Sequence, residues 1–287
     1  MNRPMSVLLV LAALLSSASV TAQGTLDRIR ERGEIRIGYR GDARPLSFEE
    51  NGAPAGYSVD LCKRVAAGIG EQLKMPAMKA TYVKVTTDNR FDALVKGDID
   101  IECGATTITL GRLERVDFTL MTFVTGGTFL SKAENRVGGP ADLAGKRIAV
   151  PRGTSTATAL QAYLKENSID ARVVTVDDRG AGMSRLTRGD VDALAGDQIV
   201  LLGDALDVLE TNKDANFSFA DALFSYEPYG FMVRRNDADF RLAVNRELAK
   251  VFRDGDQAQI YQNWVGSNGV KPSPMLIAMY LVQGLSE

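Results

Sequence analysis

Two segments, FDALVKGDID at residues 91–100 and MSRLTRGDVD at residues 183–192, share one pattern. In each, two apolar residues three positions apart precede a glycine, and Asp-apolar-Asp follows that glycine directly. This arrangement is typical of a helix that is capped by glycine and leads into a strand. We therefore interpret both Asp-apolar-Asp segments as strand residues whose carboxylates point to one polar face of a sheet. The repeat predicts two similar α/β units in one chain.

The sequence around these segments alternates strands with amphipathic helices. Apolar patterning predicts strands at 34–39, 79–85, 98–103, 147–150, 171–176 and 190–195. It predicts helices at 57–73, 89–96, 155–166, 182–188, 199–209, 238–253 and 256–264. Such alternation favours right-handed βαβ crossovers and a largely parallel sheet. Because 287 residues without a low-complexity linker suffice for two modest units, we predict two α/β lobes that face each other across a cleft.

Composition excludes several classes of function. The chain has 34 Lys and Arg against 36 Asp and Glu, so its net charge of −2 argues against nucleic acid as the main partner. It has no histidine and only two cysteines, which excludes Ser-His-Asp and Cys-His catalysis as well as the common zinc sites. We expect no metal and no cofactor. A carboxylate-based enzyme and a binding protein remain as candidates.

Residues 1–22 have the pattern of a secretory signal peptide. Arg3 precedes an apolar run at 7–15, and small residues at 16–22 end in a cleavage site after Ala22. The alternative is a buried N-terminal helix. Both this run and a second apolar stretch at 275–285 are too short to span a membrane, and we expect the second to pack as a terminal helix.

Export affects the interpretation of the two cysteines. In an oxidising compartment Cys62 and Cys103 are a candidate disulfide, which would close a loop of about 40 residues and contribute about 3–4 kcal/mol. The alternative is a pair of unrelated buried thiols.

Candidate binding groups follow the equivalent strands of the two units. Ala105-Thr106-Thr107 begins seven residues after Asp98, and Asp197 lies seven residues after Asp190. Ligands of open α/β sheets bind at the carboxyl ends of strands, and a carboxylate there suits an ammonium group. Thr154 lies in a helix start rich in hydroxyl groups. Four arginines that would suit a carboxylate or phosphate clamp occupy loops or element ends: Arg40, Arg90, Arg112 and Arg179. The alternative for any one of them alone is a solvated surface residue.

Short motifs throughout the mature chain suggest a family. They are GYSVDL at 56–61, TDNR at 87–90, ECGATT at 102–107 with Arg112, Phe118 and Thr119, and YG at 229–230. In these motifs the chain resembles family 3 periplasmic solute-binding proteins of ABC importers, specifically the glutamate/aspartate-binding branch. The resemblance covers about residues 25–264. It implies a two-lobed periplasmic-binding-protein-like (type II) fold with two hinge crossings, near 123–128 and 227–231. Lobe 1 would comprise residues 24–125 plus 230–287, and lobe 2 residues 126–229.

The same resemblance assigns roles to individual residues. Arg112 and the Thr107 backbone would hold the ligand α-carboxylate together with Thr154, and Asp197 would take the α-ammonium. The side-chain carboxylate would be bound by Arg40, Thr87 and Arg90, with Arg179 lining the same end. Two positions depart from the family pattern, since Ala105 replaces a usual serine and Arg179 replaces a frequent histidine. Where some relatives have the partner of the Cys103 equivalent, this chain has Phe231, so the resemblance leaves Cys62 as the only partner.

The resemblance implies a periplasmic, monomeric receptor that captures L-glutamate or L-aspartate, delivers it to the membrane permease subunits and performs no chemistry. Four arginines and one aspartate would make the cleft strongly positive, which favours an acidic ligand. Without histidine, we expect the affinity to stay nearly flat between pH 5.5 and 8. Two alternatives are a periplasmic ligand-sensing protein and an enzyme on the same fold that acts on a small carboxylate. The enzyme would need a cleft carboxylate as general acid.

Overall fold

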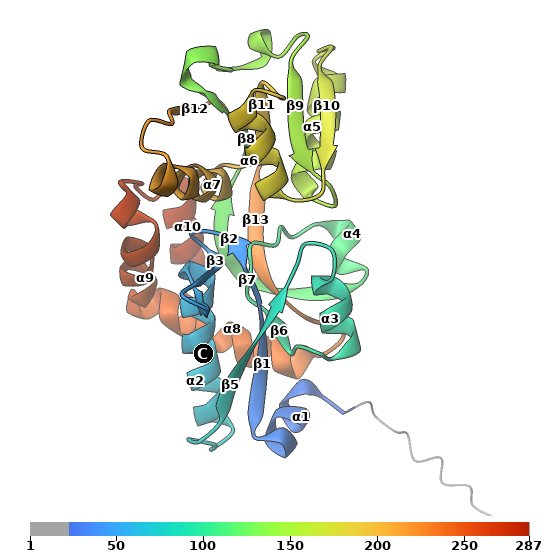
Figure 1. Cartoon of the computed structure of the whole chain (residues 1–287). Helices are drawn as coiled ribbons and strands as arrows, with labels where there is room; N and C mark the ends of the chain where they lie inside the picture. The colour runs from blue at the N-terminus through green and yellow to red at the C-terminus, as the bar shows by residue number, and fades with distance from the viewer. Residues whose placement is uncertain (1–22, 287) are drawn as a thin grey trace, which may run out of the picture.

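The computed structural model describes residues 23–286, so the predicted signal peptide at 1–22 lies outside the described residues. Two five-stranded sheets with helices packed against them form two lobes, one above the other in the view of Figure 1. The predicted two-lobed α/β fold is confirmed. No helix of this described part is both long and apolar enough to cross a membrane.

The lower lobe in Figure 1 contains the sheet β5-β1-β6-β13-β7. Its strands are β1 (Glu34–Arg40), β5 (Lys79–Val85), β6 (Ile101–Glu102), β7 (Val116–Thr125) and β13 (Glu227–Arg234), and a small separate sheet is formed by β2 (Asp42–Ala43), β3 (Ser47–Glu50) and β4 (Ala53–Ala55). Its helices are α1 (Thr25–Arg32), α2 (Tyr57–Gln72), α3 (Arg90–Lys96), α4 (Leu110–Leu113), α8 (Ala238–Asp254), α9 (Asp256–Trp264) and α10 (Pro274–Gln283).

The upper lobe contains the sheet β10-β9-β11-β8-β12. Its strands are β8 (Gly127–Lys132), β9 (Arg147–Pro151), β10 (Arg172–Val176), β11 (Ala193–Asp197) and β12 (Phe217–Phe219), and its helices are α5 (Ser155–Glu166), α6 (Arg179–Arg188) and α7 (Gln198–Thr211). In each lobe three neighbouring strands run parallel, and the fourth strand in sheet order is antiparallel to both of its neighbours. The sheets are therefore largely parallel, as predicted, with one reversed strand each.

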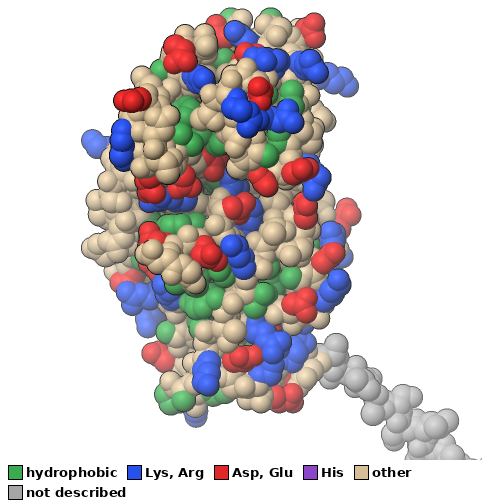
Figure 2. Space-filling model, viewed as in Figure 1, with side chains coloured by type: hydrophobic (Ala, Val, Ile, Leu, Met, Phe, Trp, Pro, Cys, Tyr) green, Lys and Arg blue, Asp and Glu red, His purple; other side chains and the backbone are tan. Residues whose placement is uncertain are grey.

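Two crossing segments connect the lobes. The first runs from β7 into β8 through Gly126, and the second leads into β13. They lie against each other, since a Cβ on Gly126 would be only 2.5 Å from the Ser225 carbonyl oxygen, and the Gly127 amide donates to that oxygen at 3.2 Å. The lobe limits stated above remain a proposal. Figure 2 shows acidic and basic side chains meeting along the boundary between the lobes.

The repeated GDID and GDVD segments begin as predicted but continue differently. Gly97 and Gly189 adopt the left-handed conformation, with φ of 84° and 80°, and cap α3 and α6. The strands that follow begin only at Ile101 and Ala193, three residues later than predicted. The Asp-apolar-Asp segments therefore precede the strands.

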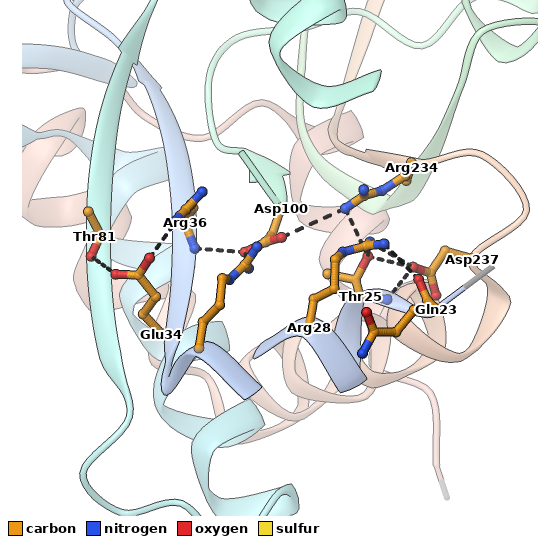
Figure 3. Close-up of polar contacts among 10 residues, drawn as sticks. Gln23, Thr25, Arg28, Glu34, Arg36, Thr81, Asp100, Arg234 and Asp237 are labelled. Carbon is orange, nitrogen blue, oxygen red and sulfur yellow. Dashed lines mark hydrogen bonds and ion pairs between the residues drawn. The ribbon is translucent and has the colours of Figure 1, made fainter. Parts of the chain in front are cut away.

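The second aspartate of each segment fastens the start of the neighbouring strand. The Asp100 amide donates to the Arg36 carbonyl at 2.8 Å, and its carboxylate accepts from the Arg36 amide at 2.9 Å. Asp192 makes the same pair of bonds with Arg147, at 2.8 and 2.7 Å. Figure 3 shows Asp100 between Arg36 and Arg234. Its side chain is fully buried in lobe 1. The interpretation of these aspartates as strand residues on one polar face was wrong.

The disulfide and the C-terminal helix stabilise lobe 1. Cys62 of α2 is bonded to Cys103, with Cα atoms 6.3 Å apart, which confirms the predicted bridge.

The predicted terminal helix is α10, and it covers the edge strand β7. There the Gln283 side chain accepts from the Met121 amide at 2.7 Å and donates to the Met121 carbonyl at 3.0 Å. A free strand edge is thereby closed close to the hinge.

Candidate ligand-binding site

A cavity lies between the two lobes, at the carboxyl ends of β1, β9 and β11. Including the part open to solvent, it measures about 590 Å³, of which about 50 Å³ has room for the centre of a water-sized molecule. The two lobes therefore lie close together around it. All nine residues selected from the sequence line this one cavity: Arg40, Thr87, Arg90, Ala105, Thr107, Arg112, Thr154, Arg179 and Asp197. Asp42, Pro151, Ser155, Thr156, Asp178, Gly196 and Val200, which were not selected, line it too.

One end of the cavity is formed by Arg40 and Arg90, each only 3% exposed. The Arg40 guanidinium donates to the Thr87 hydroxyl at 2.7 Å, and that of Arg90 donates to the Thr87 carbonyl. Burial lowers the pKa of Arg90 to about 9, although the carboxylate of Glu102 opposes the shift. Both arginines are thus held by lobe 1 itself.

Glu102, which sequence reasoning missed, lies behind these arginines and is fully buried. Its carboxylate accepts from the Thr106 hydroxyl at 3.0 Å. Burial raises the pKa of Glu102, while Arg90 and Arg40 act in the opposite direction. Gly104 permits this packing, because a Cβ there would lie 2.1 Å from the Glu102 carboxylate and 2.9 Å from the Arg40 side chain.

Arg112 lines the same cavity and belongs to the short helix α4. Its amide donates to the hydroxyl of Thr109, the N-cap of this helix, at 3.2 Å. Its guanidinium donates to the Thr107 carbonyl at 2.7 Å, and burial lowers its pKa. The hydroxyls of Thr107 and of Ser155 from lobe 2 are hydrogen-bonded at 3.0 Å, which joins the two lobes beside Arg112.

The N-terminus of α5 faces Arg112 from lobe 2. Thr154 caps this helix, because its hydroxyl accepts from the Ala157 amide at 3.1 Å and donates to the Pro151 carbonyl at 2.9 Å. The Thr154 hydroxyl is therefore already engaged, and the free amide groups of the first helical turn are the groups left to attract an anion.

Asp197 ends β11 and is paired with a second acid. Its two carboxylate oxygens accept from the hydroxyls of Thr156 and Tyr229. Burial and, to a smaller extent, the nearby Glu227 together raise the pKa of Asp197 to about 6. Glu227, also missed from sequence, is 2% exposed and accepts from Ser155 and Ser225, both at 2.8 Å. The affinity was expected to stay nearly flat between pH 5.5 and 8 because the chain has no histidine. The pKa of the Asp197 carboxyl group, about 6, lies within that range, so this premise no longer holds.

Arg179 is neutralised within the protein. Its guanidinium lies 3.3 Å from the Asp204 carboxylate and 3.5 Å from that of Asp42. Burial acts to lower the pKa of Arg179, but these two acids outweigh it and the pKa is raised. Burial likewise raises the pKa of Asp204, to about 6, against the effect of Arg179. Asp204 had a weak sequence signal, because it lies on α7 seven residues after Asp197, about two helical turns further on.

The charge balance differs from the expectation. Four arginines and three aspartates line the cavity, and Glu102, Glu227 and Asp204 lie directly behind it. The expected strongly positive cleft with one aspartate was therefore wrong, because a charge count along the sequence does not show which acids fold back onto the arginines. The Nε atoms of Arg40 and Arg90 are nevertheless buried without a hydrogen-bond acceptor within residues 23–286.

The fold and the cavity define a class of protein. Two α/β lobes joined by two crossings, with a cavity of buried opposite charges between them, form a two-lobed binding protein of the type II class. Residues 35–267 match the family model described as bacterial extracellular solute-binding proteins, family 3. The chain belongs to this family, which confirms the resemblance seen in its motifs.

Individual relatives cover most of the chain. It is 32% identical over 259 residues to the L-glutamate/L-aspartate-binding protein of Pseudomonas aeruginosa, covering 89% of this chain and 85% of that protein. It is 27% identical over 270 residues to the glutamate/aspartate import solute-binding protein of Escherichia coli, covering 92% and 88%. The crystal structure of an ancestral amino acid-binding protein, a precursor of cyclohexadienyl dehydratase, matches with a TM-score of 0.69 at 29% identity, covering 84% of this chain and 99% of that chain.

Proposed function

We propose that this protein captures an acidic L-amino acid, glutamate or aspartate, and delivers it to the permease of an ABC importer. The observation that carries this proposal is the arrangement of charge in the cavity. Arg90 and Arg112 both line the cavity, and the acid Asp197 acts electrostatically on Arg112. Two cationic groups and one anionic group complement a ligand with two carboxylates and one ammonium. The names of the relatives in Pseudomonas and Escherichia support the same ligand class.

Each cavity residue has a proposed role. Arg112, the Thr107 backbone and the first turn of α5 at Thr154 hold the α-carboxylate, and Asp197 holds the α-ammonium. Arg90, Thr87 and Arg40 bind the side-chain carboxylate, whose oxygens would supply acceptors for the buried Nε atoms of the two arginines. Arg179 and Ala105 line the cavity without a charge left over for the ligand. We propose that the receptor acts as a monomer in the periplasm, after removal of residues 1–22, and performs no chemistry.

Calorimetry of the mature protein against the twenty amino acids tests this function. We expect binding of glutamate or aspartate, its loss in Arg112→Ala and in Asp197→Ala, and a selective weakening of acidic ligands in Arg90→Lys. Lysine keeps the charge but loses the planar pair of donors that matches a carboxylate. Sub-millimolar binding of a neutral or basic amino acid, with none for glutamate or aspartate, would contradict the proposal.

A second candidate is an enzyme that acts on a small carboxylate. Asp197, with a pKa raised to about 6 by burial, is partly protonated near neutral pH and so meets the requirement for a general acid. The structural relative that preceded a dehydratase adds to this reading. Incubation with small unsaturated hydroxy acids, followed by NMR, tests it. Turnover that is lost in Asp197→Asn would favour the enzyme over the receptor.

A further inference from the structure

Asp42 places a carboxylate of the protein at the arginine end of the cavity. It belongs to the short strand β2, two residues after Arg40, and lines the same cavity. Its two oxygens lie 2.8 and 2.9 Å from one guanidinium nitrogen of Arg40. One of them lies 3.5 Å from the guanidinium of Arg179 on the opposite lobe. Asp42 therefore bridges two arginines from the two lobes.

These contacts are the ones that a ligand side-chain carboxylate would make. Asp42 stays ionised, because Arg179 and Arg40 lower its pKa against the effect of burial. Arg179 is also paired with Asp204, and Glu102 lies near Arg40 and Arg90. Three arginines at the arginine end of the cavity are thus matched by three acids. Without a ligand carboxylate this end is formally neutral, so a neutral side chain meets little uncompensated charge there.

We infer that Asp42 determines how strongly the site prefers a carboxylate over an amide at the ligand side chain. The inference deepens the proposed amino-acid receptor function and rests on it. The ionised Asp42 repels a ligand carboxylate and competes with it for Arg40, whereas an amide is not repelled. Asp42 thus broadens the substrate class from acidic amino acids toward their amides. It is a specificity-determining residue that leaves the α-carboxylate and α-ammonium subsites untouched.

The substitution Asp42→Asn removes the charge while preserving the shape, and Asp42→Ala removes the hydrogen bonds as well. In both variants we expect the ratio of glutamate to glutamine affinity to rise by about tenfold, the order of magnitude for a charge a few ångströms away that is partly screened by water. Because 47% of the Asp42 side chain is exposed, we expect the fold to tolerate both changes. Circular dichroism and the melting temperature check this.

The matched control is Asp88→Asn. Asp88 also pairs with an arginine across the lobe boundary, Arg152 at 3.3 Å, but it does not line the cavity. Calorimetric titration of wild type and the three variants with glutamate and with glutamine gives the affinity ratios. A rise confined to the two Asp42 variants supports the inference. An unchanged or lower ratio in folded Asp42→Asn, or an equal rise in Asp88→Asn, overturns it. If the wild type binds neither glutamate nor aspartate, the proposed function itself fails.

Discussion

Lowering the pH from 8 to 5 should weaken binding of an acidic amino acid, because Asp197 must be ionised to hold the ligand ammonium. Burial and, to a smaller extent, the neighbouring Glu227 together raise the pKa of Asp197 to about 6. A bound ammonium favours the ionised form and lowers that pKa again. Binding below pH 6 must therefore first remove a proton from Asp197.

The size of the effect follows from the pKa of the free protein. With that pKa near 6, the affinity at pH 5.5 is about fourfold lower than at pH 8, and at pH 5 it is about tenfold lower. The unfolding free energy should change in the opposite direction. Since the folded state binds more protons than the unfolded state between the ordinary carboxyl pKa and 6, Asp197 and Asp204 make the unliganded protein more stable as the pH falls through this range.

Isothermal calorimetry in buffers of different ionisation enthalpy measures the proton directly. At pH 6 we expect about half a proton released per glutamate bound, since the free carboxyl group is then about half protonated. Asp204→Asn serves as the control, because burial also raises the pKa of Asp204 to about 6, but its hydrogen-bond partner is Arg179. The release should persist in that variant. No proton release in the wild type, or a constant affinity from pH 8 to pH 5, would refute the reasoning.

Three further perturbations test neighbouring features. The dissociation constant depends on pH with a midpoint near 6, and Glu227→Gln should lower this midpoint, because the Glu227 charge helps to raise the pKa of Asp197. An unchanged midpoint would show that Glu227 is not a cause of the shift. Gly203→Ala should weaken ligand binding by about tenfold in calorimetry, because its Cβ would lie 2.0 Å from the Arg44 carbonyl oxygen of the other lobe and would keep the lobes apart. The control is Gly139→Ala, whose Cβ would have no neighbouring atom within 4 Å, and this variant should bind normally. Replacing Cys62 and Cys103 by serine should lower the free energy of unfolding in urea by about 3–4 kcal/mol, given a sequence separation of 41; a reductant should then change the wild type alone.

Local patterns in the sequence were sufficient to predict most of the elements. Helices ended where glycine permits a left-handed residue, as at Gly97 and Gly189. The starts of β6 and β11 were missed for a physical reason. A strand begins where its residues pair with a neighbouring strand, and the pairing of β6 with β1 begins at Ile101, opposite Ile37. Alternation in one segment carries no information about that partner.

Sequence motifs and the family resemblance predicted the residues that line the cavity, but not the acids that lie behind them. All nine selected residues lie on one cavity, whereas Glu102, Glu227 and Asp204 were missed. Asp204 lies 25 residues from Arg179 on another helix, and Glu227 opens a strand after the second crossing. Which acid neutralises an arginine depends on their distance in the folded protein. Counting charged residues along the sequence can therefore identify the arginines of a site without giving the net charge around them.

Pairing of the arginines follows from the need of a two-lobed receptor to close. Bringing unpaired guanidinium groups together in a cleft would be strongly unfavourable, because each would lose water without gaining a partner. Here pairs across the boundary offset that loss, including Arg44 with Asp207 at 2.8 Å and Arg152 with Asp88 at 3.3 Å. Such pairs favour closure whatever the ligand is, so they cannot discriminate between ligands. Discrimination must then come from the groups whose pairing the ligand changes, which are Arg90, Asp42 and Asp197. Substitutions at these three positions should alter ligand preference, whereas a change in Arg44 should alter the affinity for all ligands alike.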